Sequence, residues 1–402
     1  MGGWSFGRGV STSRNESVKL SGMTVIVIGG GPAGLAVAGA LKRRGIASTV
    51  LEQGDSVGTS WRSHYERLHL HTVRSLSALP GQSIPAGMGK WVARDDLVRY
   101  LEDYAARQEL EIRFGTQVTR IDATDPHHLP PGSDSRWVVR TARGDREAVT
   151  VVLATGYNRI PFLPDWPGAK SYRCELLHSA HYRNATPYRG KSVLVVGSGN
   201  SGAEIAVDLL EGGAREVRVS IRTPPNIQKR EFLGIPTQVV GILAQMLPVN
   251  VADGISLTLQ KVAVGNLKPY GLDPPTRGAL SRIYDDAQIP LIDAGFLKAL
   301  RARRLKVVPA VEGFTENEVV LADHSHLEVD AVIAATGYRR GLEPLVGHLG
   351  LLAPSSGLPE VAGGIASPKA PGLFFVGYRN SPGGLLRQIR IEAEALARAV
   401  EQ

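Results

Sequence analysis

The sequence predicts an α/β protein with two Rossmann-like dinucleotide-binding domains, the second inserted into the first. Two observations carry this prediction. A β-branched apolar run breaks into a glycine turn and an alanine-rich helix at Val25–Leu35, and the same arrangement returns at Lys191–Glu204. Each segment is followed downstream by Ala-Thr-Gly-Tyr at the end of an apolar run, at residues 154–157 and 335–338. Continuous Val/Ile runs of this kind are typical of buried parallel strands.

Length and composition fit a soluble globular chain of two domains. The 402 residues exceed one ordinary hydrophobic core, and 43% of them are hydrophobic and 21% charged. We interpret the formal net charge of +8 as an arginine-rich surface. No basic cluster is interleaved with aromatic residues, as a nucleic-acid groove would require, so no nucleic-acid partner is expected.

Three features bear on cellular location. Residues 1–22 are rich in Gly, Ser and Arg without an apolar core, so they are predicted to be a disordered N-terminal extension rather than a secretory signal. No apolar run of about 18 or more residues predicts a transmembrane helix. The single cysteine, Cys174, allows neither an internal disulfide nor a Cys-x-x-Cys pair, which fits a reducing, cytoplasmic setting. No metal site is assigned.

The first glycine turn predicts a dinucleotide site. Its first glycine permits the tight turn, its second lets the backbone approach a pyrophosphate, and its third lets the helix pack on the strand. The phosphates would lie on the free N–H groups at the helix N-terminus. The residues assigned to this turn are Gly29, Gly30, Gly31, Pro32, Ala33 and Gly34.

Further residues of the first domain complete this site. Glu52 ends the next strand roughly 20 residues past the glycines, where a carboxylate accepts ribose hydroxyls. Trp61 lies in an aromatic and basic stretch and is placed as a wall of the cofactor, with a core tryptophan as the alternative. Small residues that end an apolar strand indicate close approach of the backbone to a ligand. The site therefore also takes Ala154, Thr155 and Gly156, and Val118 is assigned to it as well.

The second glycine turn is predicted to prefer NADPH to NADH. Counted from the third glycine, Ser220 takes the place of Glu52, and Arg222 follows two residues later. Loss of a carboxylate and gain of a guanidinium is what a 2′-phosphate requires. An acid-terminated site and an arginine-terminated site together indicate FAD plus NADPH, with hydride passing between them. Besides Arg222, this site takes Gly197, Ser198, Gly199, Asn200, Ser201, Gly202, Thr336 and Gly337.

The predicted domain limits are residues 23–160 for the first part of the FAD domain, 161–340 for the NADPH domain and 341–402 for the return segment of the FAD domain. Residues 148–153 are expected to pair as one antiparallel strand with residues 137–141. The apolar stretch Ile235–Leu267 leaves three interpretations open: helices that cap the NADPH domain, the wall of an apolar substrate tunnel, or a membrane-surface contact. The first is preferred, and a membrane-surface contact is not expected.

Longer motifs make the sequence similar to the flavin-containing monooxygenases (class B flavoprotein monooxygenases), and most of all to their YUCCA-like branch. Besides the glycine turns and closing motifs, they are Tyr65–His71 (YERLHLH), Arg230–Gly234 (REFLG) and Ile289–Asp293 (IPLID). The resemblance covers the chain from about Met23 to its C-terminus.

One family signature, F-x-G-x-x-x-H-x-x-x-[FWY], falls on residues 172–182 with two departures. His178 and Tyr182 match, while Tyr172 and Cys174 replace the usual Phe and Gly. This segment is thought to join the domains, so altered packing rather than lost activity is expected.

The resemblance implies an NADPH-dependent FAD monooxygenase. NADPH would reduce FAD, the reduced flavin would take up O2 as a C4a-hydroperoxide, and one oxygen atom would enter a small organic substrate. That substrate would be a 2-oxo acid of the indole-3-pyruvate type, decarboxylated oxidatively, or a nitrogen or sulfur nucleophile. His71 stands where many relatives carry Asn and is the candidate to face the flavin edge, with a satisfied core or loop histidine as the alternative. Asn200 is the candidate to orient the nicotinamide or the oxidised flavin.

Other activities on this architecture are less favoured. A Baeyer–Villiger monooxygenase typically ends the family signature in Trp, whereas this chain has Tyr182. A non-catalytic flavoprotein, such as a redox sensor or an NADPH oxidase, would keep the fold without oxygenating a substrate. A pyridine nucleotide–disulfide reductase needs a cysteine pair beside the flavin, and Cys174 stands alone.

Overall fold

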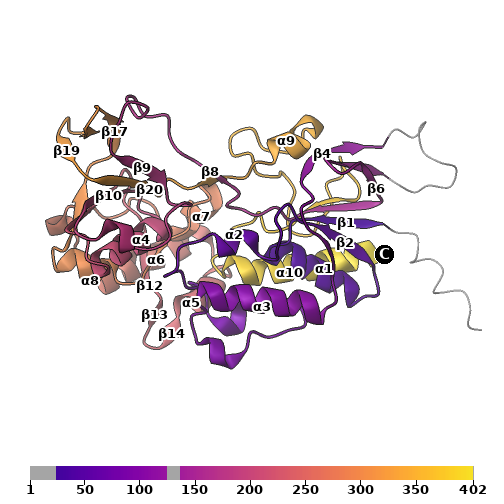
Figure 1. The fold of residues 1–402 in the computed structure, drawn as a ribbon. Helices are drawn as coiled ribbons and strands as arrows, with labels where there is room; N and C mark the ends of the chain where they lie inside the picture. The colour runs from indigo at the N-terminus through magenta and orange to yellow at the C-terminus, as the bar shows by residue number, and fades with distance from the viewer. Residues whose placement is uncertain (1–23, 125–135, 402) are drawn as a thin grey trace, which may run out of the picture.

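The computed structural model describes residues 24–124 and 136–401, so the extension predicted at residues 1–22 lies outside the described residues. Two α/β units lie side by side (Figure 1). The first unit is built from both ends of the described chain and the second from its middle, because the C-terminal segment returns to the first unit.

The first unit is organised around a parallel sheet in the order β22-β7-β1-β2-β3. Helices α1, α3 and α10 cover one face of this sheet, and α9 and a small sheet cover the other. Coverage on both faces is the reason why β1 and β7 are continuous apolar runs. The strands are β1 (Val25–Ile28), β2 (Ser48–Leu51), β3 (Glu111–Arg113), β7 (Thr150–Leu153) and β22 (Leu373–Phe375). The helices are α1 (Pro32–Lys42), α2 (Thr59–Arg62), α3 (Arg94–Arg107), α9 (Glu343–Val346) and α10 (Leu385–Glu401).

The second unit has a parallel sheet in the order β16-β11-β10-β20-β9. Helices α4 and α8 pack on one face and a small antiparallel sheet packs on the other. The strands are β9 (Glu175–His178), β10 (Ser192–Val196), β11 (Glu216–Ser220), β16 (Leu305–Val308) and β20 (Ala331–Ala334). The helices are α4 (Asn200–Glu211), α5 (Thr237–Ala244), α6 (Val249–Val264), α7 (Ala279–Asp285) and α8 (Phe296–Arg301).

The two sheets have the same strand order when strands are matched by role. In each, the strand before the glycine turn is central, with the strand of the closing Ala-Thr-Gly-Tyr motif on one side and the next strand of the chain on the other. A three-stranded antiparallel sheet precedes each closing strand. These sheets comprise β4 (Val118–Ala123), β5 (Trp137–Thr141) and β6 (Arg146–Ala148), and β17 (Val311–Phe314), β18 (Glu318–Leu321) and β19 (His326–Glu328).

The predicted pairing of residues 148–153 with residues 137–141 was wrong in part. β6 pairs antiparallel with β5 but ends at Ala148, and the chain then bends at Val149. The N–H of Val149 donates to the carbonyl oxygen of Thr24 at 3.0 Å. From Thr150 onward the chain pairs parallel with β1. The apolar run continues across the bend, so its residue types do not reveal the change of partner.

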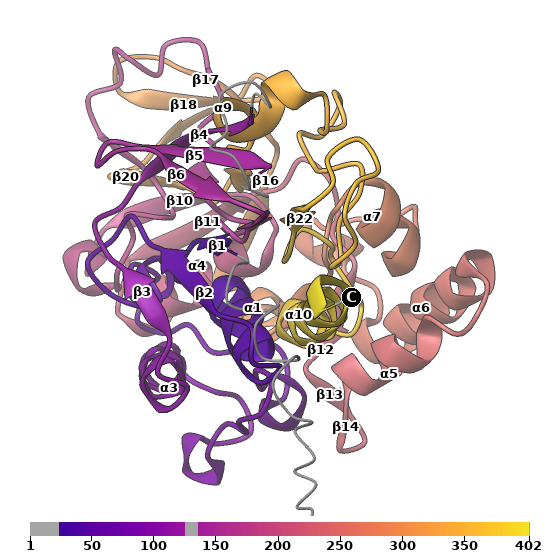
Figure 2. The same ribbon diagram turned by 90° about the vertical axis from the view of Figure 1, so that its right-hand side faces the viewer.

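The apolar stretch at residues 235–267 contains α5 and α6, which lie at the edge of the molecule in Figure 2. α6 contacts α7 and β12 of the second unit, as expected of a capping helix. α5 instead reaches the first unit through Gln238, which accepts the N–H of Val73 at 2.9 Å and donates to the carbonyl oxygen of Gly383 at 2.7 Å. Within the described residues, no helix has the length and apolar character needed to cross a membrane.

The two passages of the chain between the units lie together as a short antiparallel pair. β8 (Ile160–Pro161) leaves the first closing motif and pairs with β21 (Tyr338–Arg339), which leaves the second. The Nη1 nitrogen of Arg340 donates to the carbonyl oxygens of Tyr157 and Tyr338, at 3.1 and 2.8 Å. The final residues of both closing motifs are therefore held by one arginine.

The remaining short elements connect these parts. The strands are β12 (Ile227–Lys229), β13 (Glu231–Phe232), β14 (Ile235–Pro236) and β15 (Leu291–Asp293). The 3₁₀ turns are η1 (Arg74–Leu76), η2 (Ala86–Met88), η4 (Thr186–Tyr188), η5 (Lys268–Tyr270) and η6 (Gly347–Leu349).

Candidate nucleotide-binding and active site

Of the three glycines that form the G-x-G-x-x-G pattern of the first turn, two are crowded and one is open. Gly29 has φ +112°, and a Cβ there would lie 2.5 Å from the carbonyl oxygen of Ala154. A Cβ on Gly34 would lie 1.8 Å from the carbonyl oxygen of Gly29, so helix and strand pack too closely for a side chain. A Cβ on Gly31, at the N-cap of α1, would meet nothing within 4 Å. This open space above a helix N-terminus fits a pyrophosphate approached by backbone.

Glu52 lies at the end of β2 beside this turn. Its side chain is buried, and its carboxylate accepts the N–H of Gly30 at 2.5 Å and that of Gly54 at 2.7 Å. The carboxylate therefore ties the glycine turn to the end of the neighbouring strand. Such a group is placed to accept ribose hydroxyls next to phosphates on the turn.

A small cavity of about 50 Å³ opens beside Glu52. Four residues assigned from sequence line it, namely Gly29, Glu52, Val118 and Thr155. The other lining residues were not predicted and are Ile28, Leu51, Gln53, Thr116, Arg159 and Leu345. Thr116 and Arg159 flank assigned positions closely in sequence, and that proximity was the available signal. Leu345 comes from the return segment, and no local pattern connects it to this cavity.

Two other assigned positions lie around the first site. Trp61, on α2, is partly buried and packs against the core formed by α1 and α3, so its placement also agrees with the alternative of a core tryptophan. In the first closing motif, the hydroxyl groups of Thr155 and Tyr378 are hydrogen-bonded at 2.8 Å. Tyr378 follows β22 of the return segment, so this contact joins the closing motif to the C-terminal part of the chain. Gly156 has φ +95°, a conformation that favours glycine.

The second glycine turn repeats the geometry of the first. Gly197 has φ +119°, and a Cβ there would lie 2.4 Å from the carbonyl oxygen of Ala335. A Cβ on Gly202 would lie 2.2 Å from the carbonyl oxygen of Gly197. Gly199, the N-cap of α4, again has nothing within 4 Å of its Cβ position. The residues present therefore fit a second dinucleotide.

The sequence analysis matched Ser220 to Glu52, but the structure matches the next residue, Ile221, to Glu52. The first glycine of each turn donates its N–H to the last residue of the adjacent strand, to Leu51 at 2.8 Å and to Ser220 at 3.0 Å. Ser220 therefore corresponds to Leu51, and Ile221 corresponds to Glu52. One additional residue separates the turn from the strand end in the second unit, so counting from the glycines misplaces the register.

The second site was predicted to lack the carboxylate that Glu52 supplies to the first site. This prediction is unaffected by the corrected register, because Ile221 carries no carboxylate. The hydroxyl of Ser220 is buried and donates to the carbonyl oxygen of Pro309 at 2.8 Å. Arg222 directly follows Ile221 and is exposed. Its guanidinium makes no hydrogen bond or ion pair with another described residue, so it is available to an anionic ligand.

Asn200 is the first residue of α4 and is engaged by the protein at both ends of its amide. Its NH2 group donates to the carbonyl oxygen of Pro290 at 3.1 Å, and its oxygen accepts the N–H of Ile292 at 2.7 Å. Asn200 thus fixes the Ile289–Asp293 motif against the second glycine turn. Its role toward the nicotinamide stays a prediction.

His71 lies where the two units meet. Its Nε2 is 3.6 Å from an oxygen of Glu204 on α4, the helix that follows the second glycine turn. Burial, and then the nearby Arg230 guanidinium and His69 imidazole, lower the pKa of His71 to about 4, so the ring of His71 is neutral at pH 7. Its Nδ1 is buried and has no hydrogen-bond partner in the described part of the chain. An unpartnered buried nitrogen of this kind is one that a bound ligand can satisfy.

The family signature at residues 172–182 serves to join parts of the second unit. The Nε2 of His178 lies 2.9 Å from the carbonyl oxygen of Gly337 in the second closing motif. The hydroxyl of Tyr182 donates to Asp208 on α4 at 2.6 Å. Tyr172, one of the two departures, packs its ring on Phe314 with centroids 4.8 Å apart. These three contacts all lie within the second unit, so the expected joining of the two domains stays a prediction.

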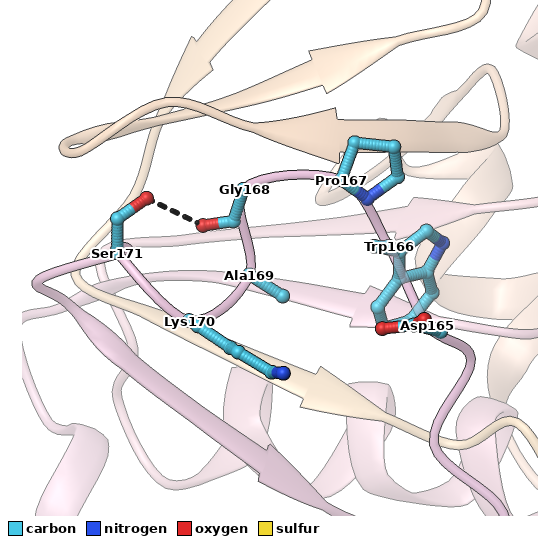
Figure 3. Close-up of a pocket in the computed structure, with 7 residues that line it drawn as sticks. All are labelled: Asp165, Trp166, Pro167, Gly168, Ala169, Lys170 and Ser171. Atoms are coloured by element: carbon cyan, nitrogen blue, oxygen red, sulfur yellow. Dashed lines mark hydrogen bonds between the residues drawn. The ribbon is translucent and has the colours of Figure 1, made fainter.

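A shallow hollow of about 460 Å³ lies elsewhere, on the linker that enters the second unit (Figure 3). Residues 165–171 line the hollow. The backbone of this segment is held to β17 by the N–H of Phe314, which donates to the carbonyl oxygen of Pro167 at 2.8 Å. The hydroxyl of Ser171 donates to the carbonyl oxygen of Gly168. None of the residues assigned to the nucleotide sites lines this hollow, so we give it no role in nucleotide binding.

The fold and the two glycine turns are typical of an oxidoreductase that binds two dinucleotides. A family model described as pyridine nucleotide-disulphide oxidoreductase matches residues 26–233. The indole-3-pyruvate monooxygenase YUCCA1 of Oryza sativa subsp. japonica is 33% identical over 356 residues, covering 88% of this chain and 86% of the relative. The probable indole-3-pyruvate monooxygenase YUCCA3 of Arabidopsis thaliana is 33% identical over 325 residues. This alignment covers 78% of this chain and 72% of the relative.

Solved structures agree with these relatives. A mutant of the flavin monooxygenase from Stenotrophomonas maltophilia has a TM-score of 0.69 at 25% identity, covering 94% of this chain and 98% of its own. A cyclohexanone monooxygenase has a TM-score of 0.71 at 19% identity, covering 94% of this chain and 88% of its own, and at that identity it supports the fold alone. The chain belongs to the YUCCA-like flavin monooxygenases, which confirms the resemblance seen in the sequence. It is an oxidoreductase with FAD and NADPH as cofactors.

Proposed function

We propose that the first glycine turn holds FAD, that the second holds NADPH, and that the chain oxidatively decarboxylates a 2-oxo acid of the indole-3-pyruvate type. The observation that carries the substrate class is the 33% identity to a rice indole-3-pyruvate monooxygenase over 88% of the chain. Bound FAD would supply the hydride acceptor and the activation of O2, which side chains do not provide.

The assignment of each cofactor to its turn rests on the two strand ends. Glu52 is fixed beside the open space at Gly31 by two backbone N–H groups, which suits the ribose of FAD. Ile221 and the exposed Arg222 directly follow the matching strand end at Ser220, which accepts the N–H of Gly197, and this suits a nucleotide with a 2′-phosphate. The side chains of this chain then have binding, orientation and exclusion of water as their tasks.

His71 is proposed to face the flavin edge. It is neutral at pH 7, it is largely buried, and its Nδ1 has no partner among the described residues. A neutral imidazole has one nitrogen that donates and one that accepts, so it can hold a proton at a defined atom near a polar ligand.

A substrate panel tests the proposal. Purified protein is supplied with NADPH and O2, and indole-3-pyruvate is compared with amines, thioethers and ketones by product analysis. We expect indole-3-acetate as the main product. Oxygenated amines or thioethers without indole-3-acetate would overturn the substrate assignment, and lactones or esters from ketones would instead favour Baeyer–Villiger chemistry. A protein without bound flavin would overturn the cofactor assignment as well.

A further inference from the structure

A buried carboxylate connects three motifs that are far apart in the sequence. Glu204 is the fifth residue of α4 and is 2% exposed. It accepts the hydroxyl of Tyr65 at 2.9 Å and a guanidinium N–H of Arg230 at 3.3 Å, and it contacts Nε2 of His71 at 3.6 Å. Tyr65 and His71 are the two ends of the YERLHLH motif, Arg230 begins the REFLG motif, and Glu204 belongs to the second glycine-turn motif.

The segment between Tyr65 and His71 packs into both units, and we call residues 65–71 the bridging segment. Tyr65 and Leu68 belong to the hydrophobic core of the second unit, whereas Leu70 belongs to the core of the first. The N–H of Leu70 donates to the carbonyl oxygen of Val92, at 2.8 Å. The bridging segment is thus fixed to the first unit through the N–H of Leu70. It is fixed to the second unit through the N–H of Glu66, which donates to the carbonyl oxygen of Arg183 at 2.9 Å, and through Tyr65, Leu68 and the contact with Glu204.

Arg230 extends this connection from the second unit. Besides its bond to Glu204, its guanidinium lies 5.5 Å from the ring centroid of Trp91, on the first unit. The next residue, Glu231, forms an ion pair with Lys90. The Arg230 guanidinium therefore contacts groups of both units, and the Glu204 carboxylate is the acceptor between them.

The position of Glu204 is otherwise unfavourable. It lies on the second turn of the helix whose N-terminus would bind phosphates, and burying an unpaired carboxylate costs several kcal/mol. Burial raises the pKa of Glu204 to about 6, against the opposing effects of Tyr65, Arg230 and Arg67. A charged group kept in such a place is explained by the partners that it holds.

We propose that Glu204 is a positioning residue that fixes the NADPH-carrying unit on the FAD-carrying unit, by holding Tyr65, Arg230 and His71 at the junction. This inference rests on the proposed function for the identity of the two ligands. As a consequence, loss of the Glu204 carboxylate should slow hydride transfer between the two sites. The two glycine turns that would hold the nucleotides should stay intact. A Cβ placed on Gly31 or Gly199 would meet no atom of Glu204 within 4 Å.

Amide hydrogen exchange tests the proposal without reference to activity. In Glu204→Ala, exchange of the N–H groups in residues 65–71 is expected to rise about tenfold or more, because a hydrogen bond to a charged group is lost. Glu392→Ala is the matched control. Glu392 is also buried on a helix, but it accepts the N–H of Gly377 at 2.9 Å within the first unit. The control is expected to leave exchange in residues 65–71 unchanged.

Anaerobic stopped-flow measurements on the flavin-loaded protein test the functional consequence. Glu204→Gln and Glu204→Ala are expected to slow flavin reduction by NADPH, the alanine variant by about tenfold or more. The dissociation constant of NADP⁺ should stay within about twofold of the wild-type value, because the second glycine turn is unchanged. Should Glu204→Ala fail to fold, Tyr65→Phe removes the partner hydroxyl alone and is expected to raise exchange in the same segment.

Wild-type exchange in residues 65–71 together with wild-type reduction rates in the folded variants would overturn the proposal. An increase in the NADP⁺ dissociation constant with an unchanged reduction rate would also overturn it, because Glu204 would then act on binding. Wild-type protein that binds no flavin, or whose flavin NADPH does not reduce, would refute the proposed function instead. The exchange experiment keeps its meaning in that case.

Discussion

Substitution of Gly199 by alanine should separate folding from NADPH binding. Gly199 has φ −77°, which alanine adopts without strain, and the Cβ would meet no atom within 4 Å. Gly→Ala at a compatible position stabilises a protein by about 0.4–1 kcal/mol, so the variant should fold at least as well as the wild type. The same methyl group would occupy the space above the N-terminus of α4, where the pyrophosphate is proposed to lie.

The expected loss of affinity follows from the hydrogen bonds at stake. Each backbone N–H bond to a charged phosphate is worth about 1.5–3 kcal/mol, so displacement of one should weaken NADP⁺ binding by about tenfold to a hundredfold. Calorimetric titration with NADP⁺ measures the affinity, thermal unfolding measures stability, and flavin absorbance per protein measures FAD content. FAD content should not change, because the first turn is untouched.

Gly202→Ala provides the contrast within the same turn. Its Cβ would lie 2.2 Å from the carbonyl oxygen of Gly197, and backbone cannot yield as a flexible side chain does. We expect destabilisation of about 3 kcal/mol or more, because overpacking costs of 1–3 kcal/mol apply to less severe contacts. A folded Gly199→Ala variant that binds NADP⁺ like the wild type would refute the assignment of this cradle to the pyrophosphate.

Three further predictions concern the other site residues. Gly31→Ala should fold normally but lose bound FAD, as read from flavin absorbance, because its Cβ position is equally open; retention of FAD would contradict the first cradle. Arg222→Gln should lower the preference for NADPH over NADH by about tenfold in flavin-reduction assays, since one ionic contact to the 2′-phosphate is lost; an unchanged ratio would remove Arg222 from the site. His71 has its pKa lowered to about 4 in the folded chain, so the unfolded chain binds protons more readily between pH 6.5 and 4. The contribution of His71 to the free energy of unfolding is therefore fully present above pH 6.5. It falls by up to about 3 kcal/mol as the pH falls to 4. Urea unfolding should show a correspondingly shallower acid dependence in His71→Asn, and equal slopes would contradict the buried neutral state of His71.

The parts of the fold that local patterns encode could be predicted from the sequence. Each glycine turn combines a buried strand, a tight turn and a helix within about 15 residues, so neighbouring residues determine its geometry. The crowded and open glycines of both turns agree with the roles that the G-x-G-x-x-G pattern predicts. The closing motifs end strands β7 and β20 beside these turns, as the repeat indicated.

The parts that depend on distant contacts could not be predicted in this way. The apolar residues around Val149 do not show where the chain exchanges one sheet for another, because both sheets accept the same residue types. The register at Ser220 was missed by one position, because helix and loop lengths between turn and strand differ by one residue in the two units. The junction at Glu204 joins residues more than 100 positions apart, such as Tyr65 at a separation of 139. Only packing of the two units brings them together.

Oxygen transfer itself tests the central claim most directly. Purified protein with NADPH and isotopically labelled O2 is given indole-3-pyruvate, and the label in the organic product is measured by mass spectrometry. A monooxygenase of this family should place one labelled oxygen atom in the carboxyl group of indole-3-acetate, with NADPH consumed in equal amount. Consumption of NADPH with formation of hydrogen peroxide and no label in any organic product, across the whole substrate panel, would contradict the account.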